Sequence, residues 1–212
     1  MNALAKSLGS YWSYSLAIVA AAFVVSPVVV QRLGPEQYGL WSTLLSAGGY
    51  LLVLDFGVHA ALVRHVAMHA ARGDDAALTR TYSTALTLLA VFAAITFTVL
   101  FAASAALVEF FDVAPPLRAE ATLVARIVAV DFALGLFGAA FLGVLAGLQR
   151  FVQVNLATIG LVIGKSVVLV VLLERGAGLT TVAVVAVAAT LCKHTLQFLL
   201  LRRERPALRY RA

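Results

Sequence analysis

Residues 83–108 have the sequence STALTLLAVFAAITFTVLFAASAALV, an apolar run without a charged side chain. A helix needs about 20 mainly apolar residues to cross the hydrocarbon core of a bilayer, and this run is longer than that. The run is continuous and does not alternate with period two, so it favours a helix over a strand of a membrane barrel. The stretch therefore predicts a transmembrane helix.

The rest of the chain repeats this pattern. Of its 212 residues, 62% are apolar and only 12% are charged, whereas soluble domains carry about 25% charged residues. Further apolar runs flank the first one, and short connections containing Gly, Pro or charged residues separate them. The sequence predicts an all-α polytopic membrane bundle, a single lobe over residues 1–212, with six transmembrane helices at about residues 10–31, 39–63, 83–108, 121–148, 153–174 and 179–201.

The basic residues are distributed unevenly between the two sides of this bundle. An N-terminus inside the cytoplasm places ten of them on that side (Lys6, Arg64, Arg72, Arg80, Arg150, Arg202, Arg203, Arg205, Arg209 and Arg211) and three outside (Arg32, Arg118 and Arg175). Cytoplasmic loops carry the excess of Lys and Arg, so both termini are predicted inside, with residues 202–212 as a basic tail. The net charge of +6 is thus explained by the membrane and gives no reason to expect nucleic acid as a partner.

Residues suited to enzymatic or metal chemistry do not form a recognisable set. Asp55 and Asp131 fall in opposite halves of the bilayer, too far apart for a catalytic carboxylate pair. Cys192 is the single cysteine, and His65 and His69, four residues apart, have no evident third ligand. We therefore predict no catalytic site, no metal site and no cofactor.

Four charged residues lie deep inside the predicted spans, namely Asp55, Asp131, Lys165 and Lys193. A charge at the bilayer centre costs about 2.5 to 3.5 kcal/mol on insertion scales, so it persists where it faces a partner or a cavity. One interpretation pairs Asp55 with Lys193 across the second and sixth spans, and Asp131 with Lys165.

The other interpretation places these four groups along a water-filled path through the bundle. Arg126 then lies near its outer mouth and Arg64 near its inner one. The deep charges cancel and the two arginines add positive charge, which favours an anionic head group as the ligand. The candidate substrate-binding residues are Asp55, Arg64, Arg126, Asp131, Lys165 and Lys193.

Two GxxxG spacings allow close approach between helices, at Gly143 and Gly147 and at Gly160 and Gly164. We interpret both mainly as tight packing inside the bundle, with a dimer face as the alternative.

The segment after the first span resembles the start of the Wzx-type flippases, the polysaccharide and O-antigen exporters of the multidrug/oligosaccharidyl-lipid/polysaccharide exporter superfamily. The resemblance is carried by LGPEQYGLW at 33–41, GYL at 49–51, LDFG at 54–57, Ala60, Arg64 and the AARGD turn at 70–74. Beyond this segment the resemblance rests on the order of spans and the short loops.

The resemblance implies a transporter in a bacterial plasma (inner) membrane that moves an isoprenoid-diphosphate-linked glycan from the cytoplasmic to the outer leaflet, for polysaccharide or lipopolysaccharide biosynthesis. Of the candidates, the matching motif includes only Asp55 and Arg64. Members of the family usually have two six-helix lobes, whereas six spans are predicted here. A second lobe is therefore an expected partner, either a missing half or another copy of this chain.

Two other functions are compatible with the sequence. One is export of a drug or small solute by a member of the same superfamily. The other is a membrane scaffold in a glycan-assembly complex with no transport of its own.

Overall fold

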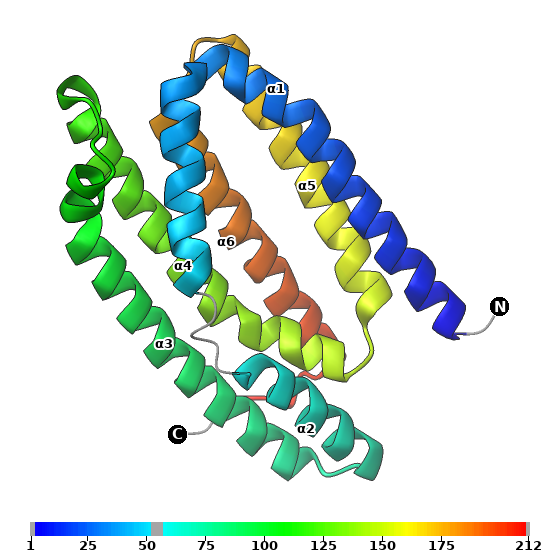
Figure 1. Cartoon of the computed structure of the whole chain (residues 1–212). Helices are drawn as coiled ribbons and strands as arrows, with labels where there is room; N and C mark the ends of the chain where they lie inside the picture. Colours follow the sequence, from blue (N-terminus) through cyan, green and yellow to red (C-terminus); the bar gives the residue numbers. More distant parts are fainter. Residues whose placement is uncertain (1–2, 52–56, 211–212) are drawn as a thin grey trace.

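The computed structural model describes residues 3–51 and 57–210, and the secondary structure in these residues is entirely helical (Figure 1). Its helices are α1 (Ala3–Leu51), α2 (Val58–Arg72), α3 (Asp75–Phe110), α4 (Arg118–Gly147), α5 (Phe151–Glu174) and α6 (Leu179–Glu204), with a 3-10 turn, η2 (Pro115–Leu117), before α4. In the described part of the chain, five helices are long and apolar enough to cross a membrane, all except α2. The predicted all-helical membrane bundle is confirmed at this level.

Helix α1 consists of two arms joined at Gly34. This glycine has φ 80° and ψ 165°, far from helical values, in a region that only glycine occupies readily. Pro35 follows, and proline suits the first turn of a helix because its missing N–H would have no partner there. The chain reverses at this point, so the second arm descends beside the bundle (Figure 1). The interruption predicted at Gly34 and Pro35 is therefore present in the structure.

The prediction that residues 39–63 form one continuous helix is wrong. Helix α1 ends at Leu51, and the separate helix α2 begins at Val58 after Gly57, whose φ is 76°. A left-handed residue cannot continue a right-handed α-helix. Hydropathy does not report backbone dihedral angles, so the apolar run concealed the break. The four later predicted spans coincide with α3, α4, α5 and α6 or fall within them, to within one residue.

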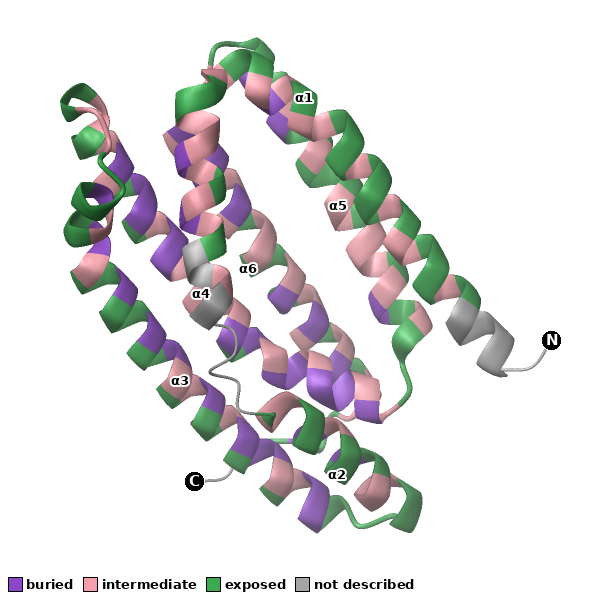
Figure 2. Cartoon of the chain, viewed as in Figure 1, coloured by how far each residue is buried: buried purple, intermediate pink, exposed green. Residues whose placement is uncertain are grey.

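Helix α4 lies at the centre of the packing and contacts α2, α3 and α6. Figure 2 shows the buried positions concentrated on α4 and on the faces turned towards it. Gly143 and Gly147 allow α2 to approach closely: a Cβ at Gly147 would lie 2.7 Å from Val66, and one at Gly143 2.7 Å from Leu62. The close packing predicted at this glycine pair is confirmed. Among the described residues, no atom lies within 4 Å of such a Cβ at Gly160 or Gly164, so the tight packing predicted for this pair is not formed there.

The first arm of α1 packs along α5 and is fastened to it near both ends. Asn155 Nδ2 donates a hydrogen bond of 3.2 Å to Ser10 Oγ at one end. Arg32 and Glu174 form an ion pair with two hydrogen bonds at the other end. The arm and α5 therefore form one side of the molecule, facing α4, α6 and the second arm of α1 (Figure 1).

The segment predicted as a basic tail, residues 202–212, begins inside α6 and packs against the bundle. Arg202 still belongs to α6, and its Nη1 donates a hydrogen bond of 3.1 Å to the carbonyl of Leu208. Leu208 is buried in the cluster that includes Leu78 and Tyr82 of α3. The chain after α6 therefore folds back onto α3.

Candidate functional site

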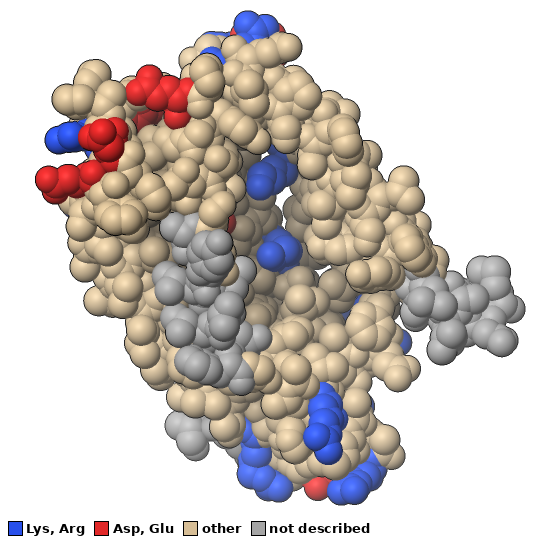
Figure 3. Space-filling view, in the orientation of Figure 1, with Lys and Arg blue, Asp and Glu red and all other residues tan. Residues whose placement is uncertain are grey.

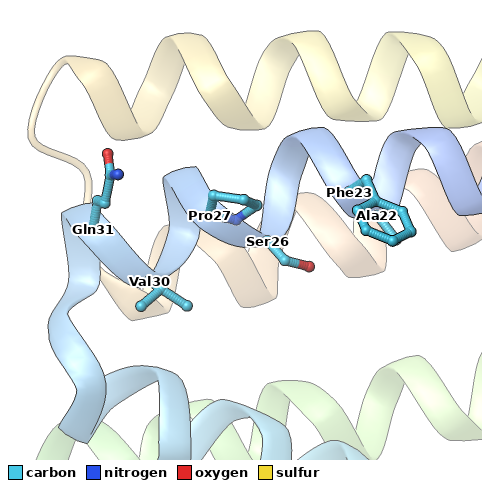
Figure 4. A pocket seen from close by; sticks show the side chains of 6 residues that line it. All are labelled: Ala22, Phe23, Ser26, Pro27, Val30 and Gln31. Carbon is cyan, nitrogen blue, oxygen red and sulfur yellow. The ribbon is translucent and has the colours of Figure 1, made fainter.

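A hollow separates the first arm of α1 and α5 from the rest of the bundle, and basic side chains lie inside it (Figure 3). On the α1 side a cavity of about 560 Å³ is lined by Ala22, Phe23, Ser26, Pro27, Val30 and Gln31. Ser26 and Val30 point away from α5 towards the space between the arms (Figure 4). The wall here is mostly apolar, with Ser26 and Gln31 as its polar groups.

Lys165 and Lys193 are the basic residues midway along α5 and α6, the helices that border the hollow. Lys165 is exposed and Lys193 is half-buried. Lys193 interacts electrostatically with Asp131 of α4 and with Lys165 of α5. The structure therefore brings three of the six predicted site residues together, from three different helices.

The direct pairing predicted between Asp131 and Lys165 is not formed. The ion pairs among the described residues are Arg32–Glu174, Arg150–Glu204 and Arg205–Asp75, all near the ends of helices. Asp131 Oδ1 is buried and has no hydrogen-bond partner among the residues that the structure describes. Its carboxylate therefore interacts with Lys193 at longer range and not through a direct ion pair.

Arg126 is held by a different helix. Its Nε donates a hydrogen bond of 3.2 Å to Ser104 Oγ, and its guanidinium lies 5.1 Å from the ring centre of Phe101. Both partners belong to α3, which places the guanidinium on the α3 side of α4. This agrees with the turn of about 140° that separates positions 126 and 131 on a helix.

The two remaining candidates are apart from this cluster. Arg64 is exposed on the short helix α2. Asp55, and with it the pair predicted between Asp55 and Lys193, lies outside the described residues.

Sequence reasoning missed His194 and Gln197, which are buried beside Lys193 on α6. Their side chains are 8% and 4% exposed, and His194 Nδ1 lies 2.9 Å from Gln197 Oε1. His194 Nε2 is buried without a partner among the described residues, and the imidazole interacts electrostatically with Asp131. The sequence feature that could have indicated this pair is a His and a Gln three residues apart in an apolar helix, because this spacing places both on one face.

Gly138 of α4 makes room for this imidazole. A Cβ at position 138 would lie 2.0 Å from His194 Nδ1, closer than non-bonded atoms approach. Because Gly138 is seven residues from Asp131, about two helical turns, both lie on the face of α4 turned towards α6. The interface between α4 and α6 thus contains a local polar patch at His194 and Gln197, within an otherwise apolar contact that includes Phe141 and Phe198.

No group of three His, Cys, Asp or Glu side chains arranged to hold a metal ion occurs in the part of the chain that the structure describes. His65 and His69 stack on each other with their ring centres 6.1 Å apart. The buried polar residues in the described part of the chain are Ser83, Thr96, Ser104, His194 and Gln197.

Comparison with curated proteins finds no match, and comparison with solved structures finds none either. A family model described as polysaccharide biosynthesis protein matches residues 4–208, nearly the whole chain. The match extends well beyond residues 33–74, where the sequence motifs lie. The chain therefore belongs to the polysaccharide biosynthesis protein family, the family of the Wzx-type flippases.

Proposed function

We propose that this chain is one lobe of a flippase that moves an isoprenoid-diphosphate-linked oligosaccharide from the cytoplasmic to the outer leaflet of a bacterial inner membrane. Membership in the family supports a membrane transporter rather than an enzyme. The observation that carries the choice of substrate is the position of Lys165 and Lys193 on the two helices that border the hollow, where Lys193 interacts with Lys165 and with Asp131.

A diphosphate is the ligand whose charge complements this cluster. An unpaired ammonium group in an apolar bundle is costly, so it is stabilised when an anion enters. Lysine binds phosphate as a point charge through up to three N–H donors. The attraction is stronger in this partly dry space than in water, because the effective dielectric constant is lower. The apolar wall at Phe23 and Val30 suits the isoprenoid portion next to the diphosphate.

We propose six spans with both termini in the cytoplasm, the two arms of α1 serving as the first two. The basic side chains support this orientation, because they gather at the lower end of Figure 3, around α2 and the end of α6. The acidic groups Glu109, Asp112 and Glu120 lie at the opposite end, where α3 meets α4. The excess of Lys and Arg marks the cytoplasmic side.

Transport by alternating access also requires a second lobe packed beside this one. We propose that this is another six-helix unit, either a separate half or a second copy. With both termini on one side, two such lobes are related by an axis along the membrane normal. Strongly exposed apolar residues on the first arm, including Leu16 at 67%, give that lobe or lipid a surface to cover.

Photo-crosslinking in membranes tests this function without requiring complete transport. The probe is a benzophenone-bearing polyprenyl diphosphate sugar. We expect labelling that an unlabelled polyprenyl diphosphate competes away and that the neutral polyprenol of equal length does not. Lys165→Gln and Lys193→Gln should each lower the labelling, whereas Arg203→Gln, an exposed basic residue at the end of α6, serves as the matched control. Equal labelling in all three variants contradicts the proposal.

Native mass spectrometry of the gently extracted protein tests the second lobe. A dimer, or a stable complex with a second six-helix chain, that retains an isoprenoid diphosphate is the expected result. A monomer of 22.4 kDa without such a lipid contradicts it.

A further inference from the structure

A second cavity lies between α2 and α3. It has a volume of about 350 Å³, within the range typical of small-molecule sites. Val58 and Ala61 of α2 and Leu88 of α3 form its apolar part, and His65, Arg80 and Thr84 form its polar part. These residues belong to neither the hollow nor the cluster around Lys193.

The cavity changes from polar to apolar along its length. Helices α2 and α3 are joined by a tight turn at Gly73 and Asp74, so positions on both helices can be ordered by their distance from this turn. Arg80 lies close to it, and Leu88 lies eight residues farther along α3, about 12 Å deeper at 1.5 Å per residue. A membrane lipid has the same order, with its charged head at the surface and its chains inward.

Arg80 has no anionic partner in the part of the chain that the structure describes. Among these residues, no ion pair, hydrogen bond or ring contact engages its guanidinium. The nearest acids in sequence are used elsewhere: Asp74 accepts a hydrogen bond of 2.8 Å from Ala77 N as the cap of α3, and Asp75 pairs with Arg205. The polar end of the cavity is therefore positively charged, and no described side chain neutralises it.

We infer that the cavity between α2 and α3 binds an anionic phospholipid, with the phosphate on Arg80 and the acyl chains along Val58, Ala61 and Leu88. Arginine matches a phosphate with two parallel hydrogen bonds, and basic pockets between membrane helices are typical sites for anionic head groups. His65 and Thr84 provide further polar groups beside the phosphate. The inference does not depend on the proposed transport function, because it uses different residues.

Lipid titration monitored by native mass spectrometry tests this site on the purified full-length chain. The probe is dioleoyl phosphatidylglycerol, and dioleoyl phosphatidylcholine has the same chains on a zwitterionic head. We expect the anionic lipid to bind first and Arg80→Gln to weaken its binding about tenfold, the range expected for one charge-assisted contact. Ala61→Phe fills the apolar part at an exposed position and should weaken binding without changing the charge.

Three controls distinguish binding in this cavity from binding elsewhere on the protein. Arg203→Gln removes a basic residue outside the cavity, and Lys165→Gln removes one that borders the hollow, so neither should change the affinity. Free glycerol 3-phosphate should not displace the lipid at equal concentration, because it lacks the chains. The inference is overturned if Arg80→Gln binds the anionic lipid as tightly as the unaltered chain, or if Arg203→Gln loses as much affinity as Arg80→Gln. It is also overturned if the zwitterionic lipid binds as tightly as the anionic one, or if glycerol 3-phosphate displaces the lipid. The thermal midpoint of each variant in detergent checks that it is folded.

Discussion

The imidazole of His194 on α6 occupies the space that a side chain at Gly138 on α4 would need, since a Cβ there would lie 2.0 Å from His194 Nδ1. Two long helices thus approach each other at a polar residue that is buried inside the bundle. The contact fixes how α4 and α6 cross, and Asp131 and Lys193 are positioned by the same two helices.

Gly138→Ala should destabilise the bundle by about 1 to 3 kcal/mol, because inserting a methyl group into a filled space displaces side chains or backbone. Gly160→Ala is the matched control, since its Cβ would have no neighbour within 4 Å. The measurement is reversible unfolding of both variants in the same detergent. Equal stability of the two variants would contradict the contact.

The double variant Gly138→Ala with His194→Ala checks that the imidazole is the cause of this loss. The two changes touch one contact, so their effects should not add, and the double variant should be more stable than the sum of the two single losses implies. Additive losses would show that the methyl group at position 138 clashes with a different neighbour.

Asp131→Asn should strengthen the binding of a diphosphate lipid, because it removes a negative charge that interacts with Lys193 and leaves the side-chain shape nearly unchanged. We expect the affinity to rise about threefold or more, as a like-charge repulsion across a partly dry space is lost. The readout is the concentration of polyprenyl diphosphate that halves photo-crosslinking. A weaker affinity would mean that Asp131 contacts the ligand or orients a lysine instead.

Arg126→Gln provides the contrasting case among the predicted site residues. Its guanidinium engages Ser104 and Phe101 on α3, so its removal should leave lipid affinity unchanged and lower stability by about 1 kcal/mol. The same two measurements, crosslinking and unfolding, separate these effects. A loss of lipid affinity with unaltered stability would show that Arg126 contributes to ligand binding.

Leu208→Ala should destabilise the chain by about 2 to 5 kcal/mol, the usual cost of truncating a buried leucine. Leu208 is 6% exposed and lies in the same cluster as Leu62 and Leu78, although it follows the last helix. Arg209→Ala alters an exposed neighbour and should change stability by less than about 0.5 kcal/mol. Similar small effects for both would show that the segment after α6 is not part of the folded core.

Apolar run length predicted the helices well because a membrane helix must satisfy its backbone internally over the whole hydrocarbon thickness. The break at Gly34 was also predictable, since Gly followed by Pro is a strong interruption. The break before α2 was not, because Gly57 is flanked by apolar residues in the sequence and a glycine inside an apolar run does not reveal its positive φ.

For the predicted site residues, the sequence gives the depth of a charge in the membrane but not the direction in which its side chain points around the helix. Hydropathy and span length give the depth of a charge, and depth selected Asp131, Lys165 and Lys193 together with Asp55, which lies outside the described residues. Of the first three, Lys193 interacts electrostatically with the other two. Direction around the helix requires knowledge of the neighbours, so the contact of Arg126 with α3 was not predictable. His194 and Gln197 were missed because neutral polar residues carry no formal charge, although their buried positions make them equally informative about the interior.

The Arg32–Glu174 pair should contribute little to stability despite joining the first arm of α1 to α5. Both side chains are about half exposed, at 48% and 49%, and exposed pairs typically contribute about 0.2 to 1 kcal/mol because water screens them. A double-mutant cycle with Arg32→Ala and Glu174→Ala, measured by unfolding in detergent, should give a coupling free energy in that range. The coupling should fall further in 1 M salt, where the screening length is about 3 Å. A coupling of several kcal/mol that persists in salt would show that the pair is dry, and the two helices would then be locked together at this end through the transport cycle.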